Sequence, residues 1–337
     1  MSETRVLLDG LRFPEGPRWH DGKLWFSDMH DGRVMTLDPS GRSETELRLD
    51  DESSGLGWLP DGRLLVVSMH QRKVLRRERD GVVEHADLSD VASFHANDMV
   101  VDRAGRAYVG NFGFDLNGGE VYKTTKLALV HPDGRVAVAA EDLLFPNGTV
   151  ITPDGSTMVI GETFAARLTA FDIAADGKLS NRRVWAELEG AVPDGICLDA
   201  EGAIWVASPI SKGVLRVREG GEVVQRIAVE HQAYACMLGS EDRRGRRRRR
   251  RGFHRTRKRS RDDRSKARAL EGFARRSLHA VAACVALARS VRRAAHNARA
   301  RAKANRASEA RRRGTRRNCW QTVKLVVDSR PQVSTSS

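Results

Sequence analysis

The chain has 337 residues, of which 40% are apolar, so it can form one large domain or two small ones with a sizeable core. The overall net charge of +14 hides two parts of opposite sign. Residues 1–240 hold 26 basic and 37 acidic side chains, whereas residues 241–337 hold 32 and 7, which gives net charges of −11 and +25. The composition predicts an acidic globular domain followed by a basic tail.

Several classes of protein are excluded by the same inspection. No stretch approaches the ~20 consecutive apolar residues that a membrane-spanning helix needs. The first residues lack the apolar region of a secretory signal peptide, so we expect a cytoplasmic protein without a membrane partner. The four cysteines are too scattered for a zinc ribbon or a dense disulfide framework.

Short strands between turns are expected along the first 240 residues. Turn dipeptides recur in steps of 40, 43, 50 and 47 residues, at Asp21-Gly22, Asp61-Gly62, Ala104-Gly105, Asp154-Gly155 and Glu201-Gly202. A short run rich in β-branched and aromatic residues follows each turn, and no helical period competes with these runs. Several strands in every ~40 to 50 residues are typical of β-propeller blades, so the fold class is predicted to be all-β.

Six repeat units can be counted, and the sixth is interrupted. The units start near Pro14, Ser53, Ala96, Pro146, Pro193 and Tyr234. Where the second strand of the last unit should follow, the sequence turns to arginine from Arg243, with six arginines at 246–251. We therefore predict a six-bladed β-propeller with a truncated last blade over 1–242. The basic tail, 243–337, is expected to be disordered or partly helical, with a basic helix over 277–295.

Oxygen-bearing side chains occupy the same position in four of the repeat units. Glu15 lies six residues before its turn dipeptide, and Asn97, Asn147 and Asp194 lie seven residues before theirs. Because the innermost strand of each blade lines the central channel, these four side chains should face one another around the axis. Carboxylates and amides gathered in this way require a cation, since their mutual repulsion and desolvation are otherwise uncompensated.

The alternative for these residues is an ordinary turn-forming role, because Asn and Asp before Gly are common in turns. That role does not explain why all four occur at one position of the repeat, so we favour a metal site. Hard oxygen ligands suit Ca²⁺ best, with Mg²⁺, Mn²⁺ and Zn²⁺ as alternatives.

Four motifs in chain order resemble the SMP-30/gluconolactonase/LRE-like family over about residues 5–242. They are Phe13-Pro-Glu-Gly-Pro-Arg-Trp, His95-Ala-Asn-Asp-Met-Val-Val-Asp, Phe145-Pro-Asn-Gly and Val192-Pro-Asp-Gly-Ile-Cys-Leu-Asp. The resemblance implies a six-bladed propeller and a divalent-metal-dependent hydrolase that opens lactones. It also implies that the metal is held by Glu15, Asn147 and Asp194.

The resemblance further implies a substrate contact at Asn97 and a general base at Asp194, whose carboxylate would take a proton from an attacking water. Two positions depart from the sugar lactonases of the family. His95 stands where those enzymes have arginine, and Asp115 is the acidic residue after the following strand. Loss of the arginine removes a fork-shaped donor for sugar hydroxyls, so gluconolactone itself is a doubtful substrate. His95 and Asp115 remain candidates for substrate binding.

Two other functions stay open at this stage. A propeller of this kind can bind metal and a partner without catalysis, because fold does not fix function. The arginine-rich tail could also bind nucleic acid through phosphate neutralisation. Since the tail begins inside a blade, however, we hypothesise that residues from about Arg243 onward arise from a shifted reading frame in a GC-rich gene. Sequencing the gene around this codon tests the hypothesis.

Overall fold

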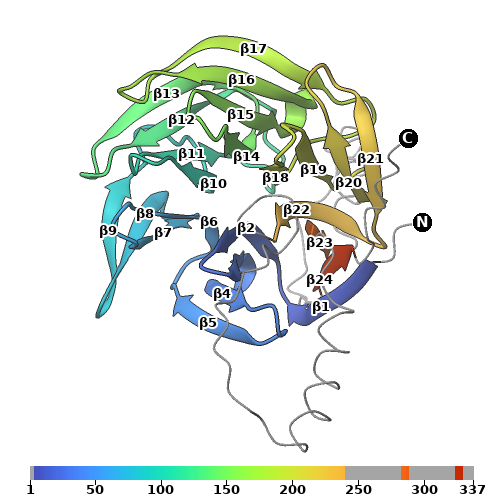
Figure 1. Cartoon of the computed structure of the whole chain (residues 1–337). Coiled ribbons are helices and arrows are strands. Elements are labelled where there is room, and N and C mark those ends of the chain that lie inside the picture. The colour runs from blue at the N-terminus through green and yellow to red at the C-terminus, as the bar shows by residue number, and fades with distance from the viewer. Residues whose placement is uncertain (1–3, 240–281, 288–322, 329–337) are drawn as a thin grey trace, which may run out of the picture.

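Five four-stranded antiparallel sheets surround a central axis like the blades of a propeller (Figure 1). The computed structural model describes residues 4–239, 282–287 and 323–328. Each of the five blades is built from four consecutive strands. Blade one comprises β2 (Pro14–His20), β3 (Lys23–Asp28), β4 (Arg33–Leu37) and β5 (Ser43–Arg48). Blade two comprises β6 (Ser53–Trp58), β7 (Leu64–Ser68), β8 (Lys73–Glu78) and β9 (Gly81–Asp87).

The remaining three blades repeat this order, with the first strand innermost (Figure 1). Blade three comprises β10 (Ala96–Val101), β11 (Ala107–Asn111), β12 (Thr125–Val130) and β13 (Val136–Leu143). Blade four comprises β14 (Pro146–Ile151), β15 (Thr157–Glu162), β16 (Arg167–Ile173) and β17 (Leu179–Glu187). Blade five comprises β18 (Ile196–Leu198), β19 (Ile204–Ser208), β20 (Gly213–Val217) and β21 (Val223–Ala228). Two short 3₁₀ helices, η1 (Met29–Asp31) and η2 (Thr163–Ala165), follow β3 and β15.

The prediction of a six-bladed propeller with a truncated last blade is wrong. The structure has five blades of consecutive strands, and β22 (Gln232–Leu238) belongs to a further sheet with the order β1-β24-β23-β22. This closing sheet is assembled from distant segments: β1 (Thr4–Leu11), β22, β23 (Ala282–Leu287) and β24 (Val323–Asp328). Register pairs run from Thr4 opposite Asp328 to Leu11 opposite Val323, so the N-terminal strand pairs with β24 and forms one edge of the closing sheet.

The predicted helix over 277–295 is also corrected, because β23 occupies its centre. The segment Ala-Ala-Cys-Val-Ala-Leu lies between β22 and β24, where pairing on both sides satisfies an extended backbone. The β24 segment, Val-Lys-Leu-Val-Val-Asp, is rich in the β-branched residues that favour strands. The arginine run at 246–251 and the predicted domain boundary at 242/243 lie outside the described residues.

The hydrophobic core lies between neighbouring blades. One buried cluster joins Val67 and Val74 of blade two to Met99 and Val109 of blade three, and another joins Ile160 of blade four to residues of blade three. Because side chains alternate along each strand, one set packs on the preceding blade and the other on the following blade. Within the described residues, none of the helices has the length and apolarity needed to cross a membrane.

Candidate metal and substrate site

The innermost strands are irregular where the predicted site residues occur. The pairing register between the first and second strands of a blade shifts after Glu15 in β2, around Asn97 in β10 and around Asn147 in β14. The same break occurs in β6 between Ser53 and Leu56. A β-bulge leaves residues out of the ladder and re-aims their side chains. One bulge position in successive blades thus brings these side chains to one place near the axis.

Neighbouring innermost strands also approach very closely at this level. Gly148 follows Asn147, and a Cβ at this residue would lie 2.5 Å from the carbonyl oxygen of Asp194. The Gly148 amide donates to that oxygen at 3.2 Å, and the Gly195 amide donates to the Tyr234 carbonyl at 2.7 Å. Glycine after the ligand position is therefore required by backbone contact between blades. This contact draws Asn147 and Asp194 together.

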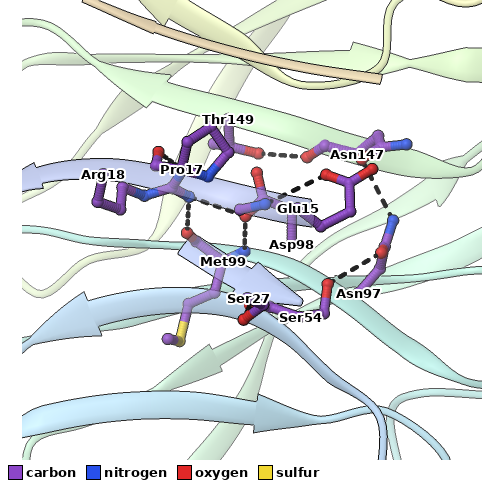
Figure 2. A network of polar contacts seen from close by, with 11 residues as sticks. Glu15, Pro17, Arg18, Ser27, Ser54, Asn97, Asp98, Met99, Asn147 and Thr149 are labelled. Atoms are coloured by element: carbon purple, nitrogen blue, oxygen red, sulfur yellow. Dashed lines mark hydrogen bonds and ion pairs between the residues drawn. The ribbon is translucent and has the colours of Figure 1, made fainter. Parts of the chain in front are cut away.

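A chain of hydrogen bonds joins the site side chains across blades two, three and four (Figure 2). The Ser54 hydroxyl donates to Asn97 Oδ1 at 3.3 Å, and Asn97 Nδ2 donates to Asn147 Oδ1 at 3.2 Å. Asn147 Nδ2 in turn donates to Thr163 Oγ1 at 3.3 Å. Both amides are therefore fixed in orientation, with Asn97 8% and Asn147 7% exposed. The oxygen of Asn147 keeps a second lone pair for another partner.

The pKa values of both carboxylates of the site, Asp194 and Glu15, are raised. For Asp194, burial and then the charge of Asp98 raise the pKa to about 8, against the lowering effect of hydrogen bonds from Asn147 and the Gly195 amide. For Glu15, burial and then the charges of Asp194 and Asp98 raise the pKa well above its ordinary value. Two negative charges held in a buried place are costly. The protein by itself therefore does not stabilise both carboxylates in their ionised forms.

Asp98, whose charge acts on both of these carboxylates, forms an ion pair with Arg18. The guanidinium Nη2 lies 2.8 Å from Asp98 Oδ1 and also donates to the Met99 carbonyl. Asp98 Oδ1 additionally accepts the Met99 amide at 2.8 Å. Figure 2 shows Arg18 of β2 directed at Asp98 and Met99 of β10. These contacts join the innermost strands β2 and β10 and are those of a residue that braces the site.

The structure places the other two predicted substrate residues at the margin of the network. The His95 ring stacks on Phe94 with centroids 4.0 Å apart and meets the His70 ring edge-on at 4.3 Å. Burial and the nearby His70 lower its pKa. The Asp115 carboxylate accepts the Gly118 amide at 2.7 Å, within the loop after β11. Glu15, Asn97, Asn147 and Asp194 are thus brought together, whereas Asp115 is not among them.

Three side chains of this region were not assigned a role from the sequence. Arg18 braces Asp98, Thr163 accepts from Asn147, and the charges of Asp194 and Glu15, after burial, raise the pKa of Tyr234. Tyr234 lies at the bulge of β22, so the repeat offered a signal for it. Neither residue type recurs at the same sequence distance from the ligand position in the other blades. No sequence signal therefore identifies Arg18 or Thr163.

The donor set of the site restricts what it can bind. Among the described residues, no three His, Cys, Asp or Glu side chains are grouped so that they could hold a metal by themselves. A cation at this place must therefore use amide oxygen together with the two carboxylates. Two carboxylates and one amide are hard oxygen donors, which suit Ca²⁺, Mg²⁺ or Mn²⁺.

Comparison with known proteins places these residues in a family. The model of the SMP-30/Gluconolactonase/LRE-like region matches residues 13–245. Regucalcin from Xenopus laevis is 25% identical over 246 residues, which cover 70% of this chain and 82% of regucalcin. The pentonolactonase XacC from Haloferax volcanii is 29% identical over 214 residues, which cover 61% of this chain and 70% of that enzyme.

A solved structure agrees with these relatives. The gluconolactonase from Xanthomonas campestris superimposes with a TM-score of 0.62 and 25% sequence identity. The match covers 72% of this chain and 84% of that enzyme. The matched family region spans Glu15, Asn97, Asn147 and Asp194 and ends shortly after β22.

Proposed function

Because this chain belongs to the SMP-30/gluconolactonase/LRE-like family, we propose that it is a divalent-metal-dependent hydrolase that opens a lactone ring. Its relatives include a pentonolactonase and a gluconolactonase, as their names state. The observation that carries the proposal is the pair of buried carboxylates, Glu15 and Asp194, whose pKa values are both raised beside amides of fixed orientation. Such a pair is compatible with stable folding when a cation neutralises it.

The metal would be held by Glu15, Asn147 and Asp194, with Ca²⁺ as the favoured ion. These donors combine two carboxylates with the amide oxygen of Asn147, which is oriented by its contacts to Asn97 and Thr163. Flexible oxygen sites of this composition accept Ca²⁺ without the strict octahedral geometry that Mg²⁺ demands. When bound, a divalent cation supplies positive charge that polarises a carbonyl oxygen.

The chemical step needs a base, and Asp194 is the candidate. Its carboxylate takes a proton from a water molecule as the water oxygen attacks the lactone carbonyl carbon. The bond between this carbon and the ring oxygen then breaks, and the ring oxygen leaves as a hydroxyl after taking up a proton.

Asn97 is the proposed substrate contact. Its amide is held from both sides, by the Ser54 hydroxyl and by Asn147, so the side chain loses little freedom when a ligand binds. The contact orients the lactone relative to Asp194. His95 and Asp115 are proposed to contact the substrate only at the outer margin of the site.

The proposal is tested by measuring the hydrolysis of unsubstituted γ- and δ-lactones with and without EDTA. We expect hydrolysis above the spontaneous rate, a loss of about 100-fold or more after chelation, and recovery when Ca²⁺ or Mn²⁺ is restored. Zn²⁺ serves as the comparison ion. Cation binding without hydrolysis of any lactone would instead favour a non-catalytic propeller. Hydrolysis that is insensitive to EDTA would contradict the metal-dependent mechanism.

A further inference from the structure

A continuous band of aromatic rings borders the site on blades three and four. We call it the aromatic band, and its members are Phe94, His95, Phe112, Phe145, Phe164 and Tyr122. Successive ring centroids lie 4.0 Å apart for Phe94 and His95, and 5.9 Å apart for His95 and Phe112. The series continues at 4.6 Å to Phe145, 5.0 Å to Phe164 and 4.4 Å to Tyr122. These distances are typical of aromatic contacts.

The band is attached directly to the proposed site. Phe145 lies two residues before Asn147, and its carbonyl accepts the amide of Thr163 at 3.2 Å. Thr163 is the residue whose hydroxyl accepts from Asn147 Nδ2, and Phe164 follows it. The Phe112 amide likewise donates to the His95 carbonyl at 2.9 Å. The rings are therefore positioned by the same segments that carry the site residues.

The backbone at Phe145 is unusual. Its φ is +58°, in the left-handed region that bulky side chains rarely adopt. The ring is only 5% exposed and contacts the rings of Phe112 and Phe164. An unfavourable backbone conformation is maintained where the surroundings require it, and such positions concentrate at functional sites. At Phe145 the conformation directs the ring into the aromatic band.

The outer part of the band is accessible and apolar. Tyr122 is 57% exposed, and the same loop after β11 carries Leu116 at 38% and Val121 at 83%. Phe112 and Phe164 are partly exposed. Most other exposed apolar side chains, such as Val184 on β17, lie singly on outer strands, which is ordinary. Exposed apolar groups gathered beside the site differ from these because they can contact a ligand.

Two polar side chains of this margin, His95 and Asp115, have contacts within the protein. The His95 ring is packed between Phe94 and His70, and Asp115 accepts the amide of Gly118. Recognition of a polyhydroxylated lactone needs donors and acceptors that are free to pair with each hydroxyl, because unpaired hydroxyls lose affinity when buried. The largest contact area at this margin is supplied by the ring faces and edges of the aromatic band.

We propose that the substrate is a lactone bearing an aromatic or similarly flat apolar substituent, which packs against Phe94, Phe112 and Phe164. This inference rests on the proposed lactone hydrolysis and specifies its substrate class. The reacting carbonyl would lie near Asp194 and the substituent would extend toward blades three and four. Contact between aromatic rings stabilises beyond the area that it buries, so the substituent should raise kcat/KM.

The test compares three δ-lactones: unsubstituted δ-valerolactone, δ-valerolactone with a phenyl group beside the ring oxygen, and δ-gluconolactone. Each kcat/KM is divided by the spontaneous hydrolysis rate of the same lactone. We expect the phenyl lactone to exceed the unsubstituted one by about tenfold or more, and gluconolactone to fall below both. The variants Phe112→Leu and Phe164→Leu should each lower the phenyl preference about fivefold.

Val184→Ala is the matched control, since it removes apolar surface from an outer strand of blade four and should leave the preference unchanged. Using a ratio of two substrates cancels any loss of folded enzyme in the variants. A preference for gluconolactone, or equal rates for the phenyl and unsubstituted lactones, overturns the substrate class and leaves lactone hydrolysis standing. If none of the three lactones is hydrolysed, the proposed function itself is overturned.

Discussion

Replacing Asp194 with asparagine is expected to lower kcat/KM for lactone hydrolysis by about 1,000-fold. The substitution keeps the size of the side chain but removes both the proposed base and one charged ligand of the cation. Asp194 is 8% exposed and lies next to Glu15. Because it is buried, a carboxylate from the protein surface cannot take over its role. The measurement is steady-state kinetics with saturating Ca²⁺ for the wild-type chain and the variant.

Asp21→Asn is the control for this variant. Asp21 is in the turn between β2 and β3, its side chain is 88% exposed, and asparagine tolerates its positive φ of 48°. We expect wild-type activity from it.

Thermal unfolding of Asp194→Asn at pH 9 without cation should occur at the same or a higher temperature than wild type. Because the pKa of Asp194 is raised in the folded state, its ionised form destabilises the folded state at this pH. An Asp194→Asn variant with wild-type activity would remove the mechanism.

The second large effect is expected on stability, from Arg18→Met. The Arg18 and Asp98 side chains are 16% and 10% exposed, and their ion pair measures 2.8 Å. Removing the guanidinium leaves the Asp98 carboxylate buried without its partner and close to two further carboxylates. Breaking such a pair costs roughly 3–5 kcal/mol. Urea unfolding of the chelator-treated chain measures this loss as a lower unfolding midpoint.

A second variant separates the ion pair from the packing of the arginine stem. In Arg18→Met/Asp98→Asn the uncompensated charge is gone, so we expect the double variant to recover about 2 kcal/mol relative to Arg18→Met. Asp98→Asn alone should keep measurable lactonase activity, because Asp98 braces the site rather than reacting. Free energies that simply add in the double variant would show that Arg18 and Asp98 are not coupled.

Much of the propeller was predictable because its signals are local. The dipeptide Asp21-Gly22 has positive φ at both residues, as a tight connection between two antiparallel strands requires. Short continuous apolar runs such as Leu64–Ser68 mark strands that are buried on both faces. The same repeat placed Glu15, Asn97, Asn147 and Asp194 at one level of the innermost strands. Which of them contacts a metal and which a substrate is still a prediction.

The closing sheet could not be predicted from local pattern. Its strand β1 pairs with β24 from the far end of the chain, and such non-local pairing leaves no short-range signal. The segment at Ala282–Leu287 combines alanine, cysteine and leucine, which fit a helix as well as a strand. Pairing between β22 and β24 decided its conformation, so tertiary context overrode a weak propensity.

The aromatic band was missed for a related reason. Phe94, Phe112 and Phe164 follow or precede strands of different blades, and their order along the chain does not reveal that their rings form one series. His95 was noted as a replacement for arginine, but its stacking on Phe94 is visible only in three dimensions. The departure from the sugar lactonases and the aromatic contacts therefore point in the same direction.

The most direct test of the central claim, that Glu15, Asn147 and Asp194 hold a divalent cation, is a calorimetric titration of Ca²⁺ into the chelator-stripped chain. The account predicts one saturable site per chain, with affinity lowered at least about 100-fold in Asp194→Asn and in Glu15→Gln, and unchanged in Asp21→Asn. Absence of saturable binding of Ca²⁺, Mn²⁺ and Zn²⁺ by the wild-type chain, or equal Ca²⁺ affinity in all four proteins, would contradict it.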